Sequence, residues 1–159
     1  MTGNSVSKHK SINQRGLWAI ALIVAFAIAA LGLTRPVTGG TNVSPVAGLM
    51  TLKASAQTAM PYASAITNGK PTLIEFYADW CTTCQSMAPS LSALHQEFDP
   101  SINFVMLNID DPQWRNQVEQ FQVTGVPHLV LQAGDGTVAE TFVGKVPKSI
   151  LAESLQYLL

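Results

Sequence analysis

The first feature of the hydrophobic pattern is a long apolar run near the N-terminus. Residues 17–34 read LWAIALIVAFAIAALGLT, eighteen residues without a charged side chain. At ~1.5 Å per residue, a helix of this length reaches about 27 Å, close to the hydrocarbon thickness of a bilayer. No polar face interrupts the run, which argues against a buried helix of a water-soluble domain. The pattern therefore predicts a single transmembrane anchor at residues 17–34.

A cleaved signal peptide is the alternative for this segment. Its apolar core usually spans about 7 to 15 residues and ends at a small-x-small cleavage site, whereas Arg35 and Pro36 follow the run here. Lys8, Lys10 and Arg15 precede it, and basic residues are sparse after it. The positive-inside bias then favours a cytoplasmic N-terminus, with the rest of the chain across the membrane.

The pattern after the apolar run divides the rest of the chain. The stretch from 35 to 58 is rich in Pro, Gly, Thr, Ser and Ala and shows little periodicity, as expected of a flexible tether. About one hundred residues remain, enough for one small core. The expected organisation is a cytoplasmic tail at 1–16, the anchor at 17–34, a flexible linker at 35–58 and a globular domain at 59–159.

Within the globular part, the periodicity alternates between that of strands and that of helices. Strands are expected at residues 72–77, 102–109, 128–132 and 138–143. Helices are expected at residues 62–68, 81–98, 110–121 and 147–159. The order βα, βα, ββα implies an α/β fold, with a mixed sheet sandwiched between helices.

The charge of the chain limits its partners. The formal net charge is −1, and no basic cluster exists outside the short N-terminal flank. This composition gives no support for nucleic-acid binding.

The two cysteines of the chain, Cys81 and Cys84, lie where the first strand passes into the long helix. A thiolate is the nucleophile in disulfide exchange, and a helix N-terminus favours it through unpaired N–H groups and the helix dipole. Cys81 occupies that position. Cys84 lies one turn further in and should be more shielded, so we expect Cys81 to attack and Cys84 to resolve the mixed disulfide.

Three other interpretations of the pair remain open. Zinc needs about four ligands, and the chain offers two cysteines and three scattered histidines. A structural disulfide would close a very short loop and would contribute little stability. Two inert buried cysteines are the third alternative.

Several motifs, in order and at the right spacing, resemble thioredoxin over about residues 60–159. They are ADWCTTC at 78–84, Pro89, LNID at 107–110, GVP at 125–127 and Gly144. NGKPT at 68–72, EFYADWC at 75–81, FVMLN at 104–108 and VPH at 126–128, behind one N-terminal anchor, further resemble the membrane-anchored thioredoxin-like proteins of thylakoids, the TxlA type of cyanobacteria and its chloroplast counterpart.

The resemblance implies roles for residues around the dithiol. A thioredoxin fold is expected, with a cis peptide bond between Val126 and Pro127. Pro127 would pack against the cysteines, and the Val126 backbone would pair with a bound substrate strand. An ordinary trans proline at the start of an edge strand is the alternative. Trp80 is expected at the rim of the active site.

Glu75 and His128 are candidate supporting residues. Glu75 lies in a strand expected to be buried on both faces, so its pKa should be raised, and it could exchange a proton with Cys84 through water. The position of the lysine that pairs with this carboxylate in thioredoxin is Met106 here, which removes the usual cation. An edge-facing carboxylate without a catalytic part is the alternative.

His128 could favour the Cys81 thiolate, although a packed or solvated strand histidine is more common.

The resemblance implies a membrane-anchored protein-disulfide reductase in the thylakoid lumen or a periplasm-like compartment. Its electrons would come from a polytopic membrane thiol transporter. Its clients would include apocytochromes, whose cysteines must be reduced before haem attachment, so the process would be cytochrome assembly. No cofactor or metal is expected. An oxidant or isomerase of the same fold, or a non-catalytic anchored scaffold that uses the groove beside Pro127, remain as alternatives.

Overall fold

The computed structural model describes residues 44–159, and their centre is a four-stranded sheet with the order β2-β1-β3-β4. The strands are β1 (Thr72–Tyr77), β2 (Asn103–Asn108), β3 (His128–Gln132) and β4 (Val138–Val143). β1 pairs in parallel with β2 and antiparallel with β3, and β3 and β4 form an antiparallel hairpin. The mixed sheet predicted from the element order is confirmed.

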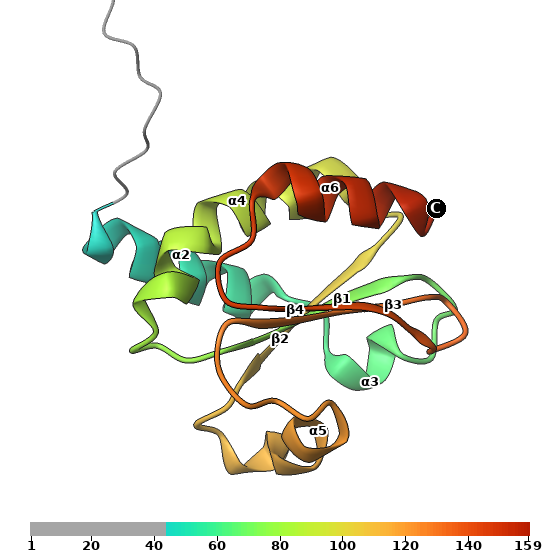
Figure 1. The fold of residues 1–159 in the computed structure, drawn as a ribbon, viewed down its shortest axis with the longest axis horizontal. Coiled ribbons are helices and arrows are strands. Elements are labelled where there is room, and N and C mark those ends of the chain that lie inside the picture. The colour runs from blue at the N-terminus through green and yellow to red at the C-terminus, as the bar shows by residue number, and fades with distance from the viewer. Residues whose placement is uncertain (1–43) are drawn as a thin grey trace, which may run out of the picture. The chain divides into compact units, whose positions relative to one another are not determined.

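Helices cover both faces of this sheet (Figure 1). On one face lie α2, α4 and α6, and on the other lie α3, the 3₁₀ turn η1 and α5. Their bounds are α2 (Pro45–Thr58), α3 (Tyr62–Ala65), α4 (Thr82–Phe98), η1 (Pro112–Trp114), α5 (Arg115–Gln120) and α6 (Lys148–Tyr157). The result is the three-layer α/β sandwich that the sequence predicts.

Strand β1 is the interior strand that leads to the cysteines. All six of its residues are buried, because each face of the sheet is covered by a helical layer. Leu73 packs under α4 and α6, whereas Ile74 and Phe76 face the α3 and α5 side. This explains why residues 73–77 read as an apolar run interrupted only by Glu75.

The predicted linker is wrong for residues 45–58, which form helix α2 packed against α4. The segment lacks a strong apolar stripe, and only Gly48 and Leu52 are buried along it. A Cβ atom at Gly48 would lie 2.6 Å from the backbone oxygen of Gln85, so only glycine permits this approach. In a regular helix the backbone N–H of residue 89 would donate to the Gln85 oxygen, but Pro89 has no N–H. Close backbone packing, which periodicity does not reveal, replaces side-chain burial here.

The other element boundaries differ from the predictions by a few residues. Helix α3 ends at Ala65 instead of residue 68, and α6 is shortened at both ends. Within residues 44–159, no helix is long and apolar enough to cross a membrane. The predicted tail at 1–16 and anchor at 17–34 lie outside the described residues.

Candidate active site

Cys81 and Cys84 form a disulfide at the start of α4, with their Cα atoms 5.3 Å apart. The strand β1 ends at Tyr77, and the short segment that follows brings Cys81 to the N-cap position of the helix. Cys84 lies in the first turn. The predicted strand-to-helix placement of the pair is therefore confirmed, and the structure shows the oxidised form.

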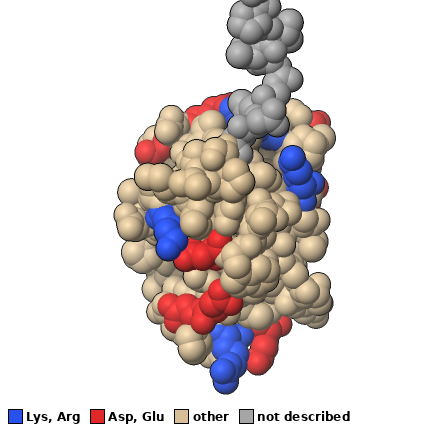
Figure 2. Space-filling model, turned by 90° about the vertical axis from the view of Figure 1, so that its left-hand side faces the viewer, with Lys and Arg blue, Asp and Glu red and all other residues tan. Residues whose placement is uncertain are grey.

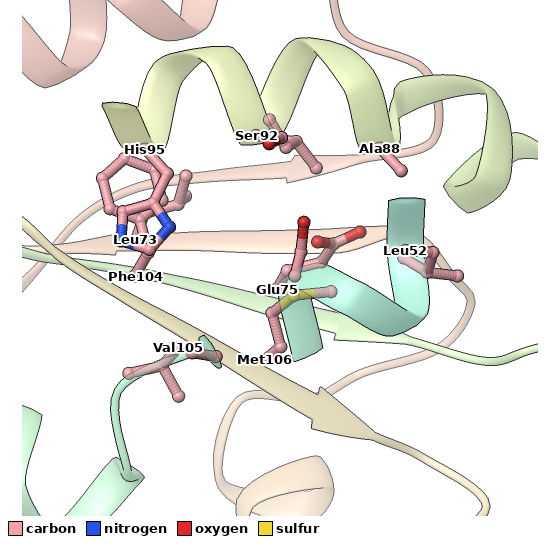
Figure 3. Close-up of a pocket in the computed structure, with 12 residues that line it drawn as sticks. Leu52, Leu73, Glu75, Ala88, Ser92, His95, Phe104, Val105 and Met106 are labelled. Carbon is pink, nitrogen blue, oxygen red and sulfur yellow. The ribbon is translucent and has the colours of Figure 1, made fainter. Parts of the chain in front are cut away.

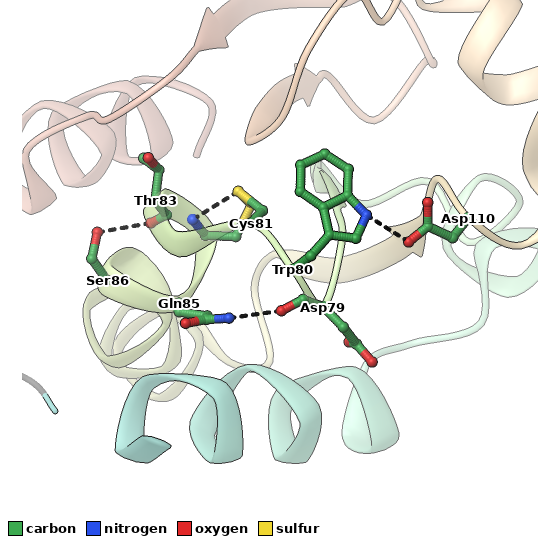
Figure 4. Close-up of a disulfide and its surroundings, with 8 residues drawn as sticks. Asp79, Trp80, Cys81, Thr83, Gln85, Ser86 and Asp110 are labelled. Atoms are coloured by element: carbon green, nitrogen blue, oxygen red, sulfur yellow. Dashed lines mark hydrogen bonds between the residues drawn. A yellow bond between two sulfur atoms is a disulfide. The ribbon is translucent and has the colours of Figure 1, made fainter. Parts of the chain in front are cut away.

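The two sulfur atoms differ in their surroundings. The Cys84 backbone N–H donates to the Sγ of Cys81 at 3.1 Å, so this sulfur caps the helix (Figure 4). Cys84 is fully buried, whereas 5% of the Cys81 surface is exposed. After reduction, the helix N–H group and the helix dipole favour a thiolate at Cys81. The geometry thus distinguishes an outer, activated sulfur from an inner, shielded one.

Three polar contacts hold the segment before Cys81 in place, and Figure 4 shows the first two of them. The Trp80 Nε1 donates to Asp110 at 2.9 Å, which fixes an indole that is 64% exposed beside the disulfide. The Gln85 side chain donates to the Asp79 backbone oxygen at 2.7 Å, and Lys53 of α2 forms an ion pair with the Asp79 carboxylate at 3.0 Å. Trp80 therefore lies exposed next to Cys81, and its part in the active site stays a prediction.

Val126 and Pro127 lie next to the cysteine cluster. The Val126–Pro127 peptide bond is cis, as expected, and Asp99–Pro100 is a second cis bond. Val126 packs against the buried cluster that contains both cysteines, and Pro127 leads directly into β3. The backbone oxygen of Pro127 accepts from Gly144 N–H at 2.8 Å, which ties this turn to the end of β4.

Glu75 is buried in the middle of the interior strand β1, so the edge-facing alternative is wrong. Only 4% of the residue is exposed, and its Oε1 atom has no hydrogen-bond partner in the described structure. Burial raises the pKa of this carboxyl group to about 8. Its register partner on β2 is Met106, so no cation takes the place opposite it. The neutral acid is therefore the stable form at neutral pH in the oxidised protein.

His128 lies on the opposite face of the sheet from Glu75. Its ring packs edge-on against Phe76, with the centroids 5.9 Å apart. Both ring nitrogens are buried without a partner in the described structure, and burial lowers the pKa of this imidazole. Its surroundings are those of a packed core histidine.

The surface at this end of the domain is mostly uncharged. Figure 2 shows acidic and basic side chains interspersed on this face, without a large area of one sign. Among residues 44–159, no group of three or more His, Cys, Asp or Glu side chains is placed to hold a metal ion. The chemistry that this site can perform is thiol-disulfide exchange at the two sulfur atoms.

The sequence analysis missed the contacts made by Lys53 and Gln85. Lys53 belongs to the segment interpreted as a linker, so nothing in its spacing connects it to Asp79. Gln85 follows Cys84 directly, and its position on the first turn of α4 would have placed it near the preceding segment.

Comparisons with known proteins agree on the family. The thioredoxin family model matches residues 53–157. The "Thiol:disulfide interchange protein TxlA homolog" of Synechocystis sp. is 44% identical over 110 residues, which cover 69% of this chain and 61% of that protein. The "Thioredoxin-like protein HCF164, chloroplastic" of Arabidopsis thaliana is 33% identical over 157 residues, which cover 99% of this chain and 55% of that protein.

A solved structure supports the same fold. Mitochondrial thioredoxin 3 of Saccharomyces cerevisiae in its oxidised form superposes with a TM-score of 0.52 and 28% identity, over 60% of this chain and 85% of that one. The chain spans between half and two thirds of the length of the two curated relatives named above.

Proposed function

This chain belongs to the thioredoxin family, and from this we propose that it is a thiol-disulfide oxidoreductase that reduces disulfides in client proteins. The observation that carries the proposal is the Cys81–Cys84 disulfide at the N-terminus of α4, with its outer sulfur capping the helix. The printed name of the Synechocystis relative, a thiol:disulfide interchange protein, supports the same chemistry.

The proposed reaction follows from the difference between the two sulfurs. In the reduced protein, the Cys81 thiolate attacks one sulfur of a client disulfide, and the other client sulfur leaves as a thiolate and takes up a proton. The Cys84 thiol loses its proton, and its sulfur attacks Cys81 Sγ in the mixed disulfide. This step releases the second client sulfur and forms the Cys81–Cys84 disulfide, so two electrons have passed to the client.

A groove beside the cis proline, which the resemblance to thioredoxin implies, is the proposed client site. Val126 lies between the cysteine cluster and the α5 side of the sheet, where an extended segment could reach Cys81. Main-chain pairing of a client with Val126 would give affinity without strict sequence preference. Trp80 and Pro127 would form the walls of this groove.

The proposed location is the lumenal side of a thylakoid membrane, or a periplasm-like compartment, with residues 17–34 as anchor and 1–16 on the cytoplasmic side. The eighteen uncharged residues of the apolar run support the anchor. The word chloroplastic in the name of the Arabidopsis relative is compatible with a plastid-type membrane. A polytopic membrane thiol transporter would supply electrons, and apocytochromes would be among the clients during cytochrome assembly.

Covalent trapping tests the function directly. In a Cys84→Ser variant the mixed disulfide cannot be resolved, so clients should stay attached to Cys81 and be recovered under non-reducing conditions. The matched control is the Cys81→Ser, Cys84→Ser double variant, which should recover none. Equal recovery by the two variants would refute covalent exchange and would favour a scaffold role.

The direction of electron flow is tested by the dithiol potential. A value near ~−270 mV is that of a reductant, and a value near about −120 mV is that of an oxidant. Equilibration of the purified domain with glutathione or dithiothreitol buffers gives the potential. We expect a reducing value, and an oxidising value would reverse the proposed direction.

A further inference from the structure

The buried carboxyl group of Glu75 lines a small cavity between the sheet and the helices α2 and α4. The cavity has a volume of about 20 Å³, enough for about one water molecule. Figure 3 shows the Glu75 side chain in the space between β1 and α4, with Ser92 and His95 on the α4 side. The cavity also abuts the cysteine cluster, because Leu52 and Ala88 belong to both.

Two helices add polar side chains to the cavity wall beside Glu75. Besides Glu75, the polar side chains that line it are Ser55 of α2 and Ser92 and His95 of α4. Ser92 and His95 are three residues apart and therefore share a face of α4. The remaining lining is apolar. A water molecule in this space has hydrogen-bonding groups toward Glu75 and toward α2 and α4.

The same three side chains also line an open groove at the surface between α2 and α4. This groove has a volume of about 430 Å³ and includes Gln96 and Asp99 at its outer part. Ser55, Ser92 and His95 thus separate a buried carboxyl group from solvent by a single layer of polar side chains. The His95 ring is held in this layer by stacking on Phe104, with the ring centroids 4.7 Å apart.

We propose that Glu75 exchanges its proton with solvent through Ser92 and His95, along the α2–α4 side of the sheet and away from the client groove. The inference rests on the proposed function, because it concerns the proton that leaves Cys84 during resolution. Neutral imidazole accepts a proton at one nitrogen and donates one at the other, so His95 can pass a proton between the cavity and the groove. Ser92 and His95 act through Glu75 and do not touch the sulfur atoms.

The proton balance of the step is simple. Ionised Glu75 takes the proton of Cys84 as this sulfur attacks Cys81, and the carboxyl group becomes neutral. The neutral acid persists in the oxidised protein. Before the next resolution step the proton leaves through the cavity water, Ser92 and His95 to the groove, which restores the carboxylate. No electron moves along this route, and the two electrons pass to the client through the sulfur atoms.

In the described part of the chain, the other ionisable groups near Glu75 do not line the cavity. On α2, Lys53 is paired with Asp79, and on β2 the facing residue is Met106. On β1, burial raises the pKa of Tyr77, and the nearby carboxylates of Asp79, Glu75 and Asp111 raise it further. Among the residues that line the cavity, His95 is therefore the one titratable partner of Glu75.

A His95→Phe variant tests the route, because phenylalanine keeps the stacking on Phe104 and removes both nitrogens. The reduced protein is mixed with saturating hydroxyethyl disulfide at low buffer concentration, and attack and resolution are followed separately by rapid mixing. We expect resolution to slow by about tenfold with unchanged attack, since a positioned acid or base contributes about 10²- to 10⁴-fold where it acts directly. The pH profile of resolution should change shape as well.

Chemical rescue distinguishes proton transfer from a structural effect. In a His95→Ala variant, added imidazole should restore resolution, whereas it should not affect the wild type. Gln96→Ala is the matched control, because Gln96 lines the groove but not the cavity. If His95→Phe does not fold, Ser92→Ala should show a smaller loss in the same direction.

Two results would overturn the inference. One is wild-type resolution and an unchanged pH profile in the His95 variants, and the other is a loss that imidazole does not restore. Either result, together with successful trapping by Cys84→Ser, would leave the proposed function intact. Failure of trapping would instead refute the function itself.

Discussion

The two faces of the central sheet each bury one titratable side chain without a full set of hydrogen bonds, but the surroundings of the two side chains differ. Glu75 on β1 faces α2 and α4, whereas His128 on β3 faces the α5 side next to Phe76. The two residues are only one register position apart, since Glu75 pairs with Leu129 and Phe76 pairs with His128. Their exposed fractions are similar, 4% and 3%.

The difference lies in what surrounds each group. Glu75 lines a cavity with a polar wall that continues into a surface groove, whereas His128 is not among the lining residues and packs against an aromatic ring. Burial disfavours the charged form of both groups, so it raises the pKa of Glu75 and lowers the pKa of His128. Burial alone therefore does not identify a proton-transfer group. The feature that distinguishes Glu75 is the proposed path to solvent on the sheet face that α2 and α4 cover.

The largest expected effect is on the pH dependence of stability, through Glu75→Gln. Burial raises the pKa of Glu75 from an ordinary value of 4.5 to about 8 in the folded protein. The folded state then holds the proton more tightly, so wild-type stability should fall as pH rises from about 4.5 through about 8, by at most about 5 kcal/mol. Glu75→Gln should remove this slope. Urea unfolding of the oxidised proteins between pH 5 and 9 measures it, and parallel curves would contradict the burial of the acid.

The next effect is on the proton affinity of Glu75, through Met106→Lys. Met106 faces Glu75 across the strand pair and is partly exposed, so a lysine there can place its charge beside the carboxylate. An opposite charge close to a carboxylate lowers its pKa by about 1 to 3. We expect the pH midpoint of the resolution step to move to lower pH by a similar amount. Met106→Gln is the uncharged control and should move it little.

The smallest effect concerns His128→Leu on the other face. The variant removes two buried nitrogens without partners and should raise the free energy of unfolding by about 1 kcal/mol at pH 7. The folded pKa of His128 is lowered from 6.5, so the wild type should also lose stability as pH falls through that value. The variant should lack this loss. The pH profile of disulfide exchange should stay unchanged in this variant. A shifted profile would show that His128 takes part in the reaction, which would contradict the difference proposed between His128 and Glu75.

Much of the fold follows from local patterns. The alternation of strands and helices and the buried character of β1 are both readable from periodicity. Helix α2 is not readable in this way, because it packs through the close approach of Gly48 to the Gln85 backbone and through Leu52, and not through an apolar stripe. Small residues look the same in a flexible linker and in a closely packed helix.

The active-site pair was also predictable, because the position of a cysteine at a helix start determines its chemistry. The contacts around the two cysteines were only partly predictable from the sequence. The ion pair between Lys53 and Asp79 joins residues far apart in the chain. No local signal connects them, since the contact exists only once α2 has docked on α4.

The sequence by itself determined the element order and the position of the dithiol, because these depend on neighbours along the chain. Only the tertiary structure decided that Glu75 lines a cavity closed by Ser55, Ser92 and His95, and that His128 faces the opposite side. The physical reason is that solvent access to a buried group depends on gaps between packed elements. Such gaps arise from three segments meeting in space, and a one-dimensional pattern does not encode them.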